Sequence, residues 1–465
     1  MEVTQSFVDL LAKFQCVFTA PTWLLFTHLM TGWILSPRHR YVTELIWSSG
    51  KTRNGHHSRY HRFFSKSVWE LDCLSHVLAK LLISLFAPTG TIHLAVDDTL
   101  CRKRGLNVYG TGMHHDPLIS SRAKPLTSWG HDWVVLTLIV SGLFWAPSKV
   151  WSCSLAFRLY RNRQGVTKGK KKKNKNGKKA QKTKKVKRVS GAKPAHRTRP
   201  ELAVELISLM AGWFPDRQFL VTGDSAYGGQ SVLKKLPPNV HLISHVHPKG
   251  AMFEPAPIIQ PGQKGRHRKK GARLPGMKEW ALDGQPWQEL VFDQFGLKAT
   301  LRVKTRQALY YTAGGQRLLS IVLVQDVLGK RPDQMFYCTN LEWDARQVLS
   351  CYAGRWSIEL TFENSKQLLG FEDPANRKPK AVERTAPMAL VLHSLTIAWF
   401  HTVGHLYVKF PDRPWYTKKR EPSFADMLTT LRRLSWQDKF RGVLPQRGLA
   451  KKLLAQVADF LSLAA

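Results

Sequence analysis

The sequence predicts an α/β fold in which short apolar strands alternate with amphipathic helices around one sheet. Three observations support this prediction. Strand and helix signals follow one another in a regular order between residues 91 and 245. Two of the predicted strands end on an aspartate, Asp97 and Asp224. A predicted helix further along the chain carries a stripe of polar side chains at residues 352–366.

The order of the predicted elements defines the core. Apolar runs rich in β-branched residues predict three strands, and then a helix, a strand, a helix and a strand follow. These elements lie at residues 91–96, 132–140, 150–159, 200–214, 219–222, 232–236 and 241–245. The order of three strands, helix, strand, helix, strand is that of a ribonuclease-H-like core. In that fold, acidic residues lie at the ends of the first and fourth strands, which are the positions of Asp97 and Asp224.

The remaining segments divide around this core. We expect a helical N-terminal domain for DNA binding or dimerisation, a core in two parts that a β-rich insertion separates, and a basic helical C-terminal region. The N-terminal domain is expected at 1–90 and the C-terminal region at 406–465. The two parts of the core are expected at 91–247 and 341–405, with the β-rich insertion at 248–340 between them.

The charge of the chain indicates a polyanionic partner. Lys and Arg number 71 against 32 Asp and Glu, which gives a formal net charge of +39. Such an excess favours nucleic acid. Residues 161–199 hold 18 of the basic residues, no acidic ones and no apolar pattern. We expect this run to be a disordered loop that contacts phosphates without sequence preference.

Other classes of protein fit less well. The six cysteines form no CxxC pair, which argues against a structural zinc site. His114, His115 and Asp116 are adjacent but lack matching partners, so we expect a polar loop there. Two stretches without charged residues, 17–35 and 386–408, contain histidine, and the first also contains proline. We therefore expect buried helices there and no membrane partner.

The polar stripe has two interpretations. Tyr352, Arg355, Glu359 and Lys366 are spaced by 3, 4 and 7 residues. In one continuous helix they fall within roughly 60° of arc. They form either ion pairs on an exposed face or a surface that holds a metal and a phosphate. Glu363, one turn beyond Glu359, competes for the same role.

Carboxylates far apart in the sequence suit phosphodiester cleavage. Two Mg²⁺ ions about 4 Å apart stabilise the attacking and leaving oxygens, and hard cations prefer carboxylate ligands. Asp97 and Asp224 on strand ends, with Glu359 on a helix, supply such ligands. Asp98 is a rival to Asp97, although Asp at a strand end also suits a simple turn.

These residues resemble a known family. The pattern Y-x2-R-x3-E-x6-K, met by Tyr352, Arg355, Glu359 and Lys366, resembles the signature of bacterial DDE transposases of the insertion-sequence-four type. The DDT at 97–99, the GDSAYGG at 223–229 and the RWSIELTFENSKQLLGF at 355–371 are similar to further motifs of that family. The resemblance covers roughly residues 90–400, and the lysine-rich loop departs from it.

The resemblance implies a set of roles. Asp97, Asp224 and Glu359 would hold two Mg²⁺ ions, for which Mn²⁺ can substitute. Tyr352 and the cations Arg355 and Lys366 would grip DNA phosphates. The partner would be double-stranded DNA, both the terminal inverted repeats of a transposon and the target. A dimer would form on that DNA, in the bacterial cytoplasm at the nucleoid.

The implied reaction is cut-and-paste transposition. In this family water nicks the element end, and the freed 3′-OH attacks either target DNA or the opposite strand to form a hairpin. A tryptophan of the insertion would then hold a flipped base, with Trp280, Trp287 and Trp343 as candidates. The alternatives are a catalytically inactive DNA-binding protein derived from a transposase, or another nuclease of the ribonuclease-H type such as a junction resolvase.

Overall fold

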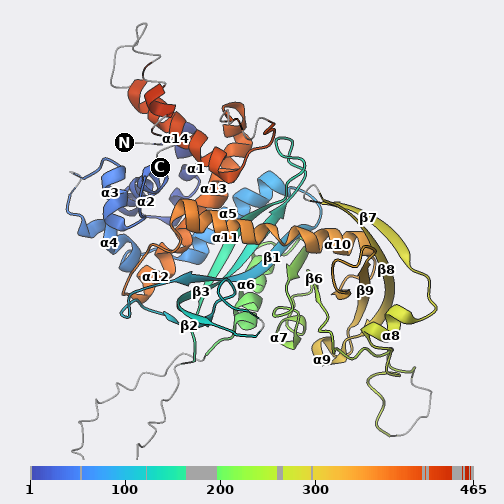
Figure 1. Ribbon diagram of the computed structural model, residues 1–465. Coiled ribbons are helices and arrows are strands. Elements are labelled where there is room, and N and C mark those ends of the chain that lie inside the picture. The colour runs from blue at the N-terminus through green and yellow to red at the C-terminus, as the bar shows by residue number, and fades with distance from the viewer. Residues whose placement is uncertain are drawn as a thin grey trace, which may run out of the picture.

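One mixed sheet of ten strands runs through the molecule (Figure 1). The computed structural model describes residues 3–52, 55–121, 123–163, 196–258, 265–294, 297–410, 414, 418–441, 453, 456–459 and 461. The strands follow the order β2-β3-β1-β5-β6-β10-β9-β8-β7, and β4 pairs with β3. The expected α/β fold with helical terminal regions is confirmed. Most of the lysine-rich run at 161–199 lies outside the described residues.

The strands of the core follow the predicted order. They are β1 (Ile92–Arg102), β2 (Gly112–His115), β3 (Thr127–Val140), β4 (Trp151–Tyr160), β5 (Phe219–Gly223) and β6 (Val240–His245). The first and second predicted strands are longer than expected, because β1 and β3 pair in antiparallel register as far as Arg102 and Gly130. The short strand β2 extends this ladder and was not predicted.

The strands between residues 288 and 338 extend the same sheet. They are β7 (Gln288–Gln294), β8 (Leu297–Leu309), β9 (Leu318–Asp326) and β10 (Gln334–Cys338). β10 pairs antiparallel with β6 on one side and with β9 on the other. The segment is therefore β-rich and is joined to the core by a continuous hydrogen-bonded ladder. The short helices α8 (Met277–Leu282) and α9 (Tyr311–Gly314) accompany it.

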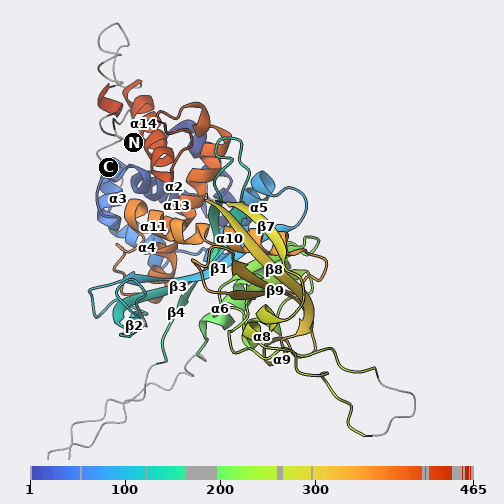
Figure 2. The ribbon, with the colours of Figure 1, turned by 45° about the vertical axis from the view of Figure 1, so that its right-hand side comes forward.

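Most helices from the two ends of the chain gather away from β7–β9 (Figure 2), whereas α10 packs against β5, β6 and β7. The N-terminal helices are α1 (Gln5–Ala12), α2 (Ala20–Leu35), α3 (Val42–Ser48), α4 (Ser58–Ser65) and α5 (Leu71–Phe86). The later helices are α10 (Ala345–Gly354), α11 (Ser357–Leu369), α12 (Pro379–Thr385), α13 (Pro387–Thr402) and α14 (Phe424–Arg441). Residues of α13 are buried from Pro387 to Phe400, as expected of a core helix without charges. Among the described residues, no helix combines the length and the apolar character needed to cross a bilayer.

Two further helices flank β5. These are α6 (Arg199–Trp213) and α7 (Gln230–Leu233). The start of α6 has a local cause, because the Thr198 hydroxyl accepts from the Glu201 amide and the Glu201 carboxylate accepts from the Thr198 amide. Pro200 occupies the first turn, where its missing N–H costs nothing. The capping box thus fixes where α6 leaves the preceding segment and packs on β3 and β4.

Candidate active site

Asp97 and Asp224 lie side by side on neighbouring strands. β1 and β5 are parallel, and Val96 is opposite Gly223 in their register. Asp97 is the next residue of β1 and Asp224 is the first residue after β5, so their backbones start from a pair about 5 Å apart, the spacing of paired strands. Gly223 permits this arrangement, since a Cβ there would be 2.9 Å from the Cβ of Tyr227. The two candidate aspartates predicted from sequence therefore meet at one place on the sheet.

The two adjacent aspartates of β1 point in opposite directions. Asp97 is 8% exposed, and its carboxylate forms an ion pair with the guanidinium of Arg355. Asp98 accepts a 2.6 Å hydrogen bond from the hydroxyl of Tyr227 and lies 3.4 Å from Nε of Arg199 on α6. Successive side chains of a strand alternate between its faces, so only Asp97 faces α10 and α11.

The expectation of one continuous helix through residues 352–366 was wrong. α10 ends at Gly354 and α11 begins at Ser357. Across the junction the amides bond three residues back, as Ile358 does to Arg355 and Glu359 does to Trp356. Such 3₁₀ bonds wind the chain more tightly than an α-helix. The four residues of the stripe are therefore divided between two helices, with Arg355 at the junction.

The aromatic and cationic members of the stripe contact the core around Asp97. The ring of Tyr352 packs 4.7 Å from that of Phe336 on β10 and 4.8 Å from that of His245 on β6. The Arg355 guanidinium lies 5.6 Å from the centre of the Tyr352 ring. Lys366 donates a 2.8 Å hydrogen bond from Nζ to the backbone carbonyl of Leu100 on β1.

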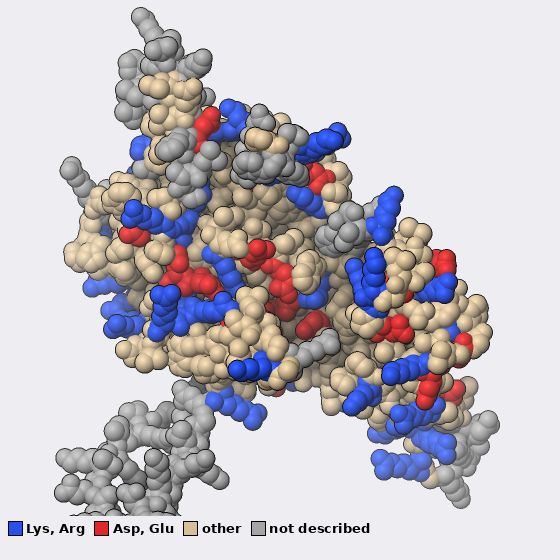
Figure 3. Space-filling view, viewed as in Figure 1, with Lys and Arg blue, Asp and Glu red and all other residues tan. Residues whose placement is uncertain are grey.

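Both glutamates of α11 are exposed to solvent. Glu359 lies in the first turn of the helix, nearest the junction, whereas Glu363 lies one turn further on. The side chain of Glu363 accepts a 3.2 Å hydrogen bond from Gln367. Figure 3 shows acidic side chains gathered over α11 with lysine and arginine on either side.

The electrostatics of Asp97 show how the acidic groups are arranged. Burial raises the pKa of Asp97 to about 7, and the Arg355 guanidinium opposes this shift. The carboxylates of Asp224, Asp98 and Glu359 each raise the pKa further. A carboxylate acts in this way only at short range through a partly buried region. Asp224 and Glu359 therefore both lie within electrostatic reach of Asp97, on β5 and α11 respectively.

The chemistry of this group fits a divalent cation, but its present geometry is not a finished cage. Carboxylate oxygens are the ligands that Mg²⁺ prefers, and a cation would relieve their mutual repulsion. Yet no three Asp, Glu, His or Cys side chains in the described part of the chain form a cluster that could hold a metal as they stand. The Asp97 carboxylate instead forms an ion pair with the Arg355 guanidinium. Metal binding at Asp97 therefore requires this guanidinium to move.

A second polar network lies behind the site. Arg199 bridges Asp98 and Asp132, and Nδ1 of His114 lies 3.5 Å from the Asp132 carboxylate. Burial, reinforced by the Asp98 carboxylate, raises the pKa of Asp132, and burial lowers the pKa of His114 to about 4. The sequence prediction missed Arg199 and Asp132. The expectation of a polar loop at 114–116 was wrong, since His114 and His115 lie on β2.

The turn after β5 is tied into this network. Tyr227 is fully buried, and its hydroxyl joins the turn to Asp98 on β1. The hydroxyl of Ser244 on β6 donates a 2.7 Å hydrogen bond to the carbonyl of Asp224. The Ser244 bond holds the backbone of Asp224 directly, and the Tyr227 bond ties the turn that carries Asp224 to β1. The spacing of Gly223, Asp224 and Tyr227 in the sequence was the only available sign of this arrangement.

The three candidate tryptophans each pack against a neighbouring cationic or aromatic side chain. Trp280 on α8 is fully buried, and the Arg306 guanidinium is 3.8 Å from its ring centre. Trp287 is half-buried, with Nζ of Lys304 4.7 Å from its ring centre. Trp343 is half-buried, with its ring 5.8 Å from that of His93. In this conformation each ring is at least partly covered.

Comparison with known proteins identifies the family. The profile of the DDE superfamily endonucleases matches residues 13–313, which is more than half of the chain. The match includes Asp97 and Asp224 and ends before Glu359. It begins within the N-terminal helices, earlier than the resemblance seen at the level of motifs. No curated protein matches the chain significantly.

The family assignment carries a general activity. DDE superfamily endonucleases are nuclease-type enzymes of phosphoryl transfer that act on DNA and typically use divalent metal ions. The mixed sheet with its helical terminal regions is consistent with the ribonuclease-H-like fold of such enzymes. On the match over residues 13–313 and this fold, the chain belongs to the DDE superfamily endonucleases.

Proposed function

We propose that this protein is a DNA transposase of the insertion-sequence-four type, which cuts DNA at transposon ends and joins them to target DNA by a cut-and-paste route. One observation carries the proposal. Asp97 and Asp224 follow the paired residues Val96 and Gly223 on adjacent parallel strands, and Arg355 of the Y-R-E-K pattern contacts Asp97. The sequence pattern and the acidic pair therefore belong to one site.

In the proposed mechanism Asp97, Asp224 and Glu359 hold two Mg²⁺ ions, or Mn²⁺ in their place. Bound metal would activate the attacking water or 3′-OH and stabilise the leaving oxygen. The protein holds Asp97 on β1 and Asp224 directly after β5, two strands whose register is fixed. Glu359, exposed on the first turn of α11, is free to turn toward them.

The cations of the pattern are proposed to bind phosphate. Arg355 can form two parallel hydrogen bonds with a phosphate, and Lys366 can supply a point charge. In the free protein Arg355 pairs with Asp97, and Lys366 bonds a carbonyl of β1. A DNA phosphate between α11 and β1 would compete for both side chains. Tyr352, packed against Phe336 and His245, holds the Arg355 junction in place.

Three further features belong to the proposal. Two chains would assemble on DNA, because a transposon has two terminal inverted repeats and both must be cut. The second strand would be cut through a hairpin intermediate. A flipped base would stack on one of Trp280, Trp287 and Trp343, of which the half-buried Trp287 and Trp343 need the smaller rearrangement.

The decisive experiment compares the two glutamates of α11. Glu359→Gln should abolish Mg²⁺-dependent cleavage of transposon-end DNA and leave DNA binding near that of the wild type. Glu363→Gln is the matched control, since it removes the same charge one helical turn away, and it should retain cleavage. Cleavage by the Glu359→Gln protein at the wild-type rate would refute the site.

A second candidate function is a catalytically inactive DNA-binding protein derived from a transposase. The pairing of Arg355 with Asp97, which leaves no preformed metal cage among the described residues, is the observation that favours it. Wild-type protein that binds transposon-end DNA but does not cut it in Mg²⁺ or Mn²⁺ would support this second function.

A further inference from the structure

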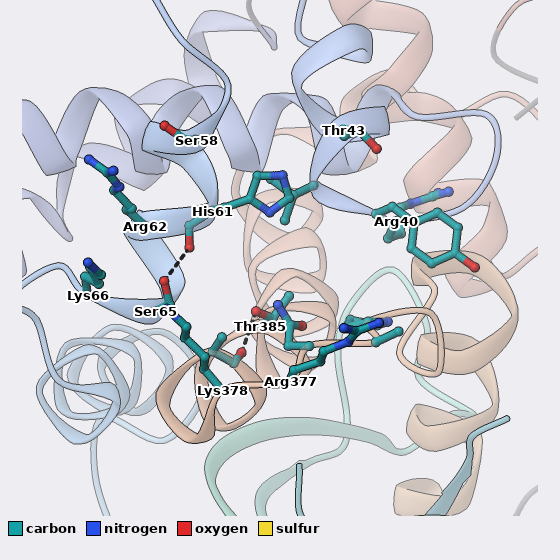
Figure 4. Close-up of a pocket in the computed structure, with 16 residues that line it drawn as sticks. Arg40, Thr43, Ser58, His61, Arg62, Ser65, Lys66, Arg377, Lys378 and Thr385 are labelled. Atoms are coloured by element: carbon teal, nitrogen blue, oxygen red, sulfur yellow. Dashed lines mark hydrogen bonds between the residues drawn. The ribbon is translucent and has the colours of Figure 1, made fainter. Parts of the chain in front are cut away.

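A basic hollow lies between α4 and the segment that leads into α12 (Figure 4). It encloses about 560 Å³. Arg62 of α4 and Lys66, the residue directly after it, belong to one wall, and Arg377 and Lys378 belong to the facing wall. No Asp or Glu is among its described lining residues. We call this feature the α4–α12 groove.

The cations of the α4–α12 groove are available to a ligand. Arg62, Lys66, Arg377 and Lys378 are all exposed. Within the described ranges of the chain, none of the four forms an ion pair with a carboxylate. Exposed cations usually have carboxylates nearby, but these four belong to the lining of one hollow that contains no Asp or Glu among its described residues. A polyanion is the partner that this arrangement fits.

The two walls are fixed to each other. Arg384 of α12 is 3% exposed and donates a 2.8 Å hydrogen bond to the carbonyl of Ser67, just after α4. Its guanidinium also lies 4.5 Å from the ring centre of Trp69. The floor includes Arg40, which is 4% exposed and bonds the carbonyl of Leu368 at the end of α11. The backbone positions that carry the cations are therefore set before a ligand binds, which lowers part of the entropic cost of binding.

The groove is connected to the candidate active site by α11. From Glu359 the helix runs to Leu369, a length of about 15 Å at 1.5 Å per residue. At Gly370 the backbone turns with φ +62, and a Cβ there would lie 2.3 Å from the Asp373 carboxylate. The chain then enters the groove wall at Pro374. This length is less than one turn of B-DNA, which spans about 34–36 Å.

We infer that the α4–α12 groove binds the phosphate backbone of the duplex whose end lies in the active site, within about one helical turn of the cut. Lysine and arginine side chains that contact phosphates position a duplex without reading its sequence. The hydroxyl groups of Ser58 and Thr43, which also line the groove, are further donors for phosphate oxygens. The inference rests on the proposed function only in placing a DNA end at Asp97 and Asp224.

The test is a comparison of two double variants with equal net charge. Lys66→Ala with Lys378→Ala removes one lysine from each wall of the groove. Lys13→Ala with Lys80→Ala is the control, because both lysines are exposed and line a different hollow. Binding of a mixed-sequence duplex of about 30 base pairs, roughly three helical turns, is measured in EDTA over a range of salt concentrations, so the readout does not depend on cleavage.

The expected result follows from counterion release. Each phosphate contact contributes about 0.9 to the slope of log K against log salt, so the groove variant should lose about 1.8 of that slope. Its affinity at 0.15 M salt should fall roughly 30-fold, whereas the control should stay within about threefold of the wild type. Lys66→Arg with Lys378→Arg should restore binding.

Two outcomes would overturn the inference. One is a salt slope for the groove variant equal to that of the control variant. The other is an affinity of the groove variant at 0.15 M salt that stays within about threefold of the affinity of the control variant. A protein that fails to cut DNA but shows the expected slopes would refute the proposed function and leave the groove assignment intact.

Discussion

The buried carboxylate of Asp97 makes the stability of the metal-free protein depend on pH. Its pKa in the folded state is raised from 3.8 to about 7, mainly by burial. Because the folded-state pKa is raised, the folded protein binds the Asp97 proton more tightly than the unfolded chain does. This proton stabilises the fold fully below pH 3.8, and the stabilisation is lost as the pH rises through 7. The wild-type protein should therefore lose stability between these limits because of this group.

Asp97→Asn isolates the effect. The variant keeps the shape of the side chain but cannot ionise. Its stability therefore does not include the pH-dependent contribution of Asp97. Leaving Arg355 without a carboxylate has a cost of its own, but that cost is the same at both pH values and cancels from the comparison. Between pH 5.5 and 8, the stability of the variant minus that of the wild type should increase by about 2 kcal/mol, from 1.5 pH units at 1.36 kcal/mol each.

Urea unfolding in EDTA at pH 5.5, 6.5, 7 and 8 and constant ionic strength measures this difference. Glu363→Gln is the control. Because Glu363 is exposed, the stability of this variant minus that of the wild type should stay constant across the pH range to within about 0.5 kcal/mol. Mg²⁺ at pH 8 should stabilise the wild type more than Asp97→Asn, because the ion binds the ionised carboxylate. A constant difference between Asp97→Asn and the wild type across the four pH values would refute the reasoning.

Two further predictions concern the support of the site and the basic run. Tyr227→Phe removes the hydroxyl that donates to Asp98, so the free energy of unfolding should fall by about 1.5–3 kcal/mol. The kcat for cleavage should also fall, with little change in DNA affinity. Unchanged stability in urea would contradict the role of Tyr227 in holding the turn to β1. Deletion of residues 165–195 removes many lysines and no acidic residue. The slope of log K for DNA binding against log salt concentration should therefore become less steep. An unchanged slope would show that this run does not contact phosphate.

The strand order and the positions of the aspartates could be predicted because both depend on local pattern. Apolar runs of four to nine residues identify strands, and a polar residue at the end of such a run marks the sheet edge. The register that sets Val96 opposite Gly223 pairs the first five residues of β1 with the whole of the shorter strand β5. Asp224 follows the end of β5 as predicted, whereas the predicted strand end at Asp97 was wrong, because pairing with β3 extends β1 to Arg102.

The helix junction and the polar network could not be predicted in the same way. Gly354 directly before the junction was the one local sign of a helix end, but Arg355 and Trp356 keep helical dihedral angles. The change lies in the hydrogen bonds, which tertiary contacts of Arg355 with Asp97 favour. His114 looked like part of a loop because its neighbours are polar. Its burial beside Asp132 depends on β2 pairing with β3, a contact between distant residues.

The adjacent aspartates of β1 show how one dipeptide can serve two layers of the site. Because side chains alternate along a strand, Asp97 faces α11 while Asp98 faces α6. Asp98 binds Tyr227, which belongs to the turn that carries Asp224. The residue beside one proposed metal ligand therefore fixes the turn that bears the other. It follows that Asp98→Asn should disturb the placement of Asp224 more than the charge at the metal site, whereas Asp97→Asn should do the reverse.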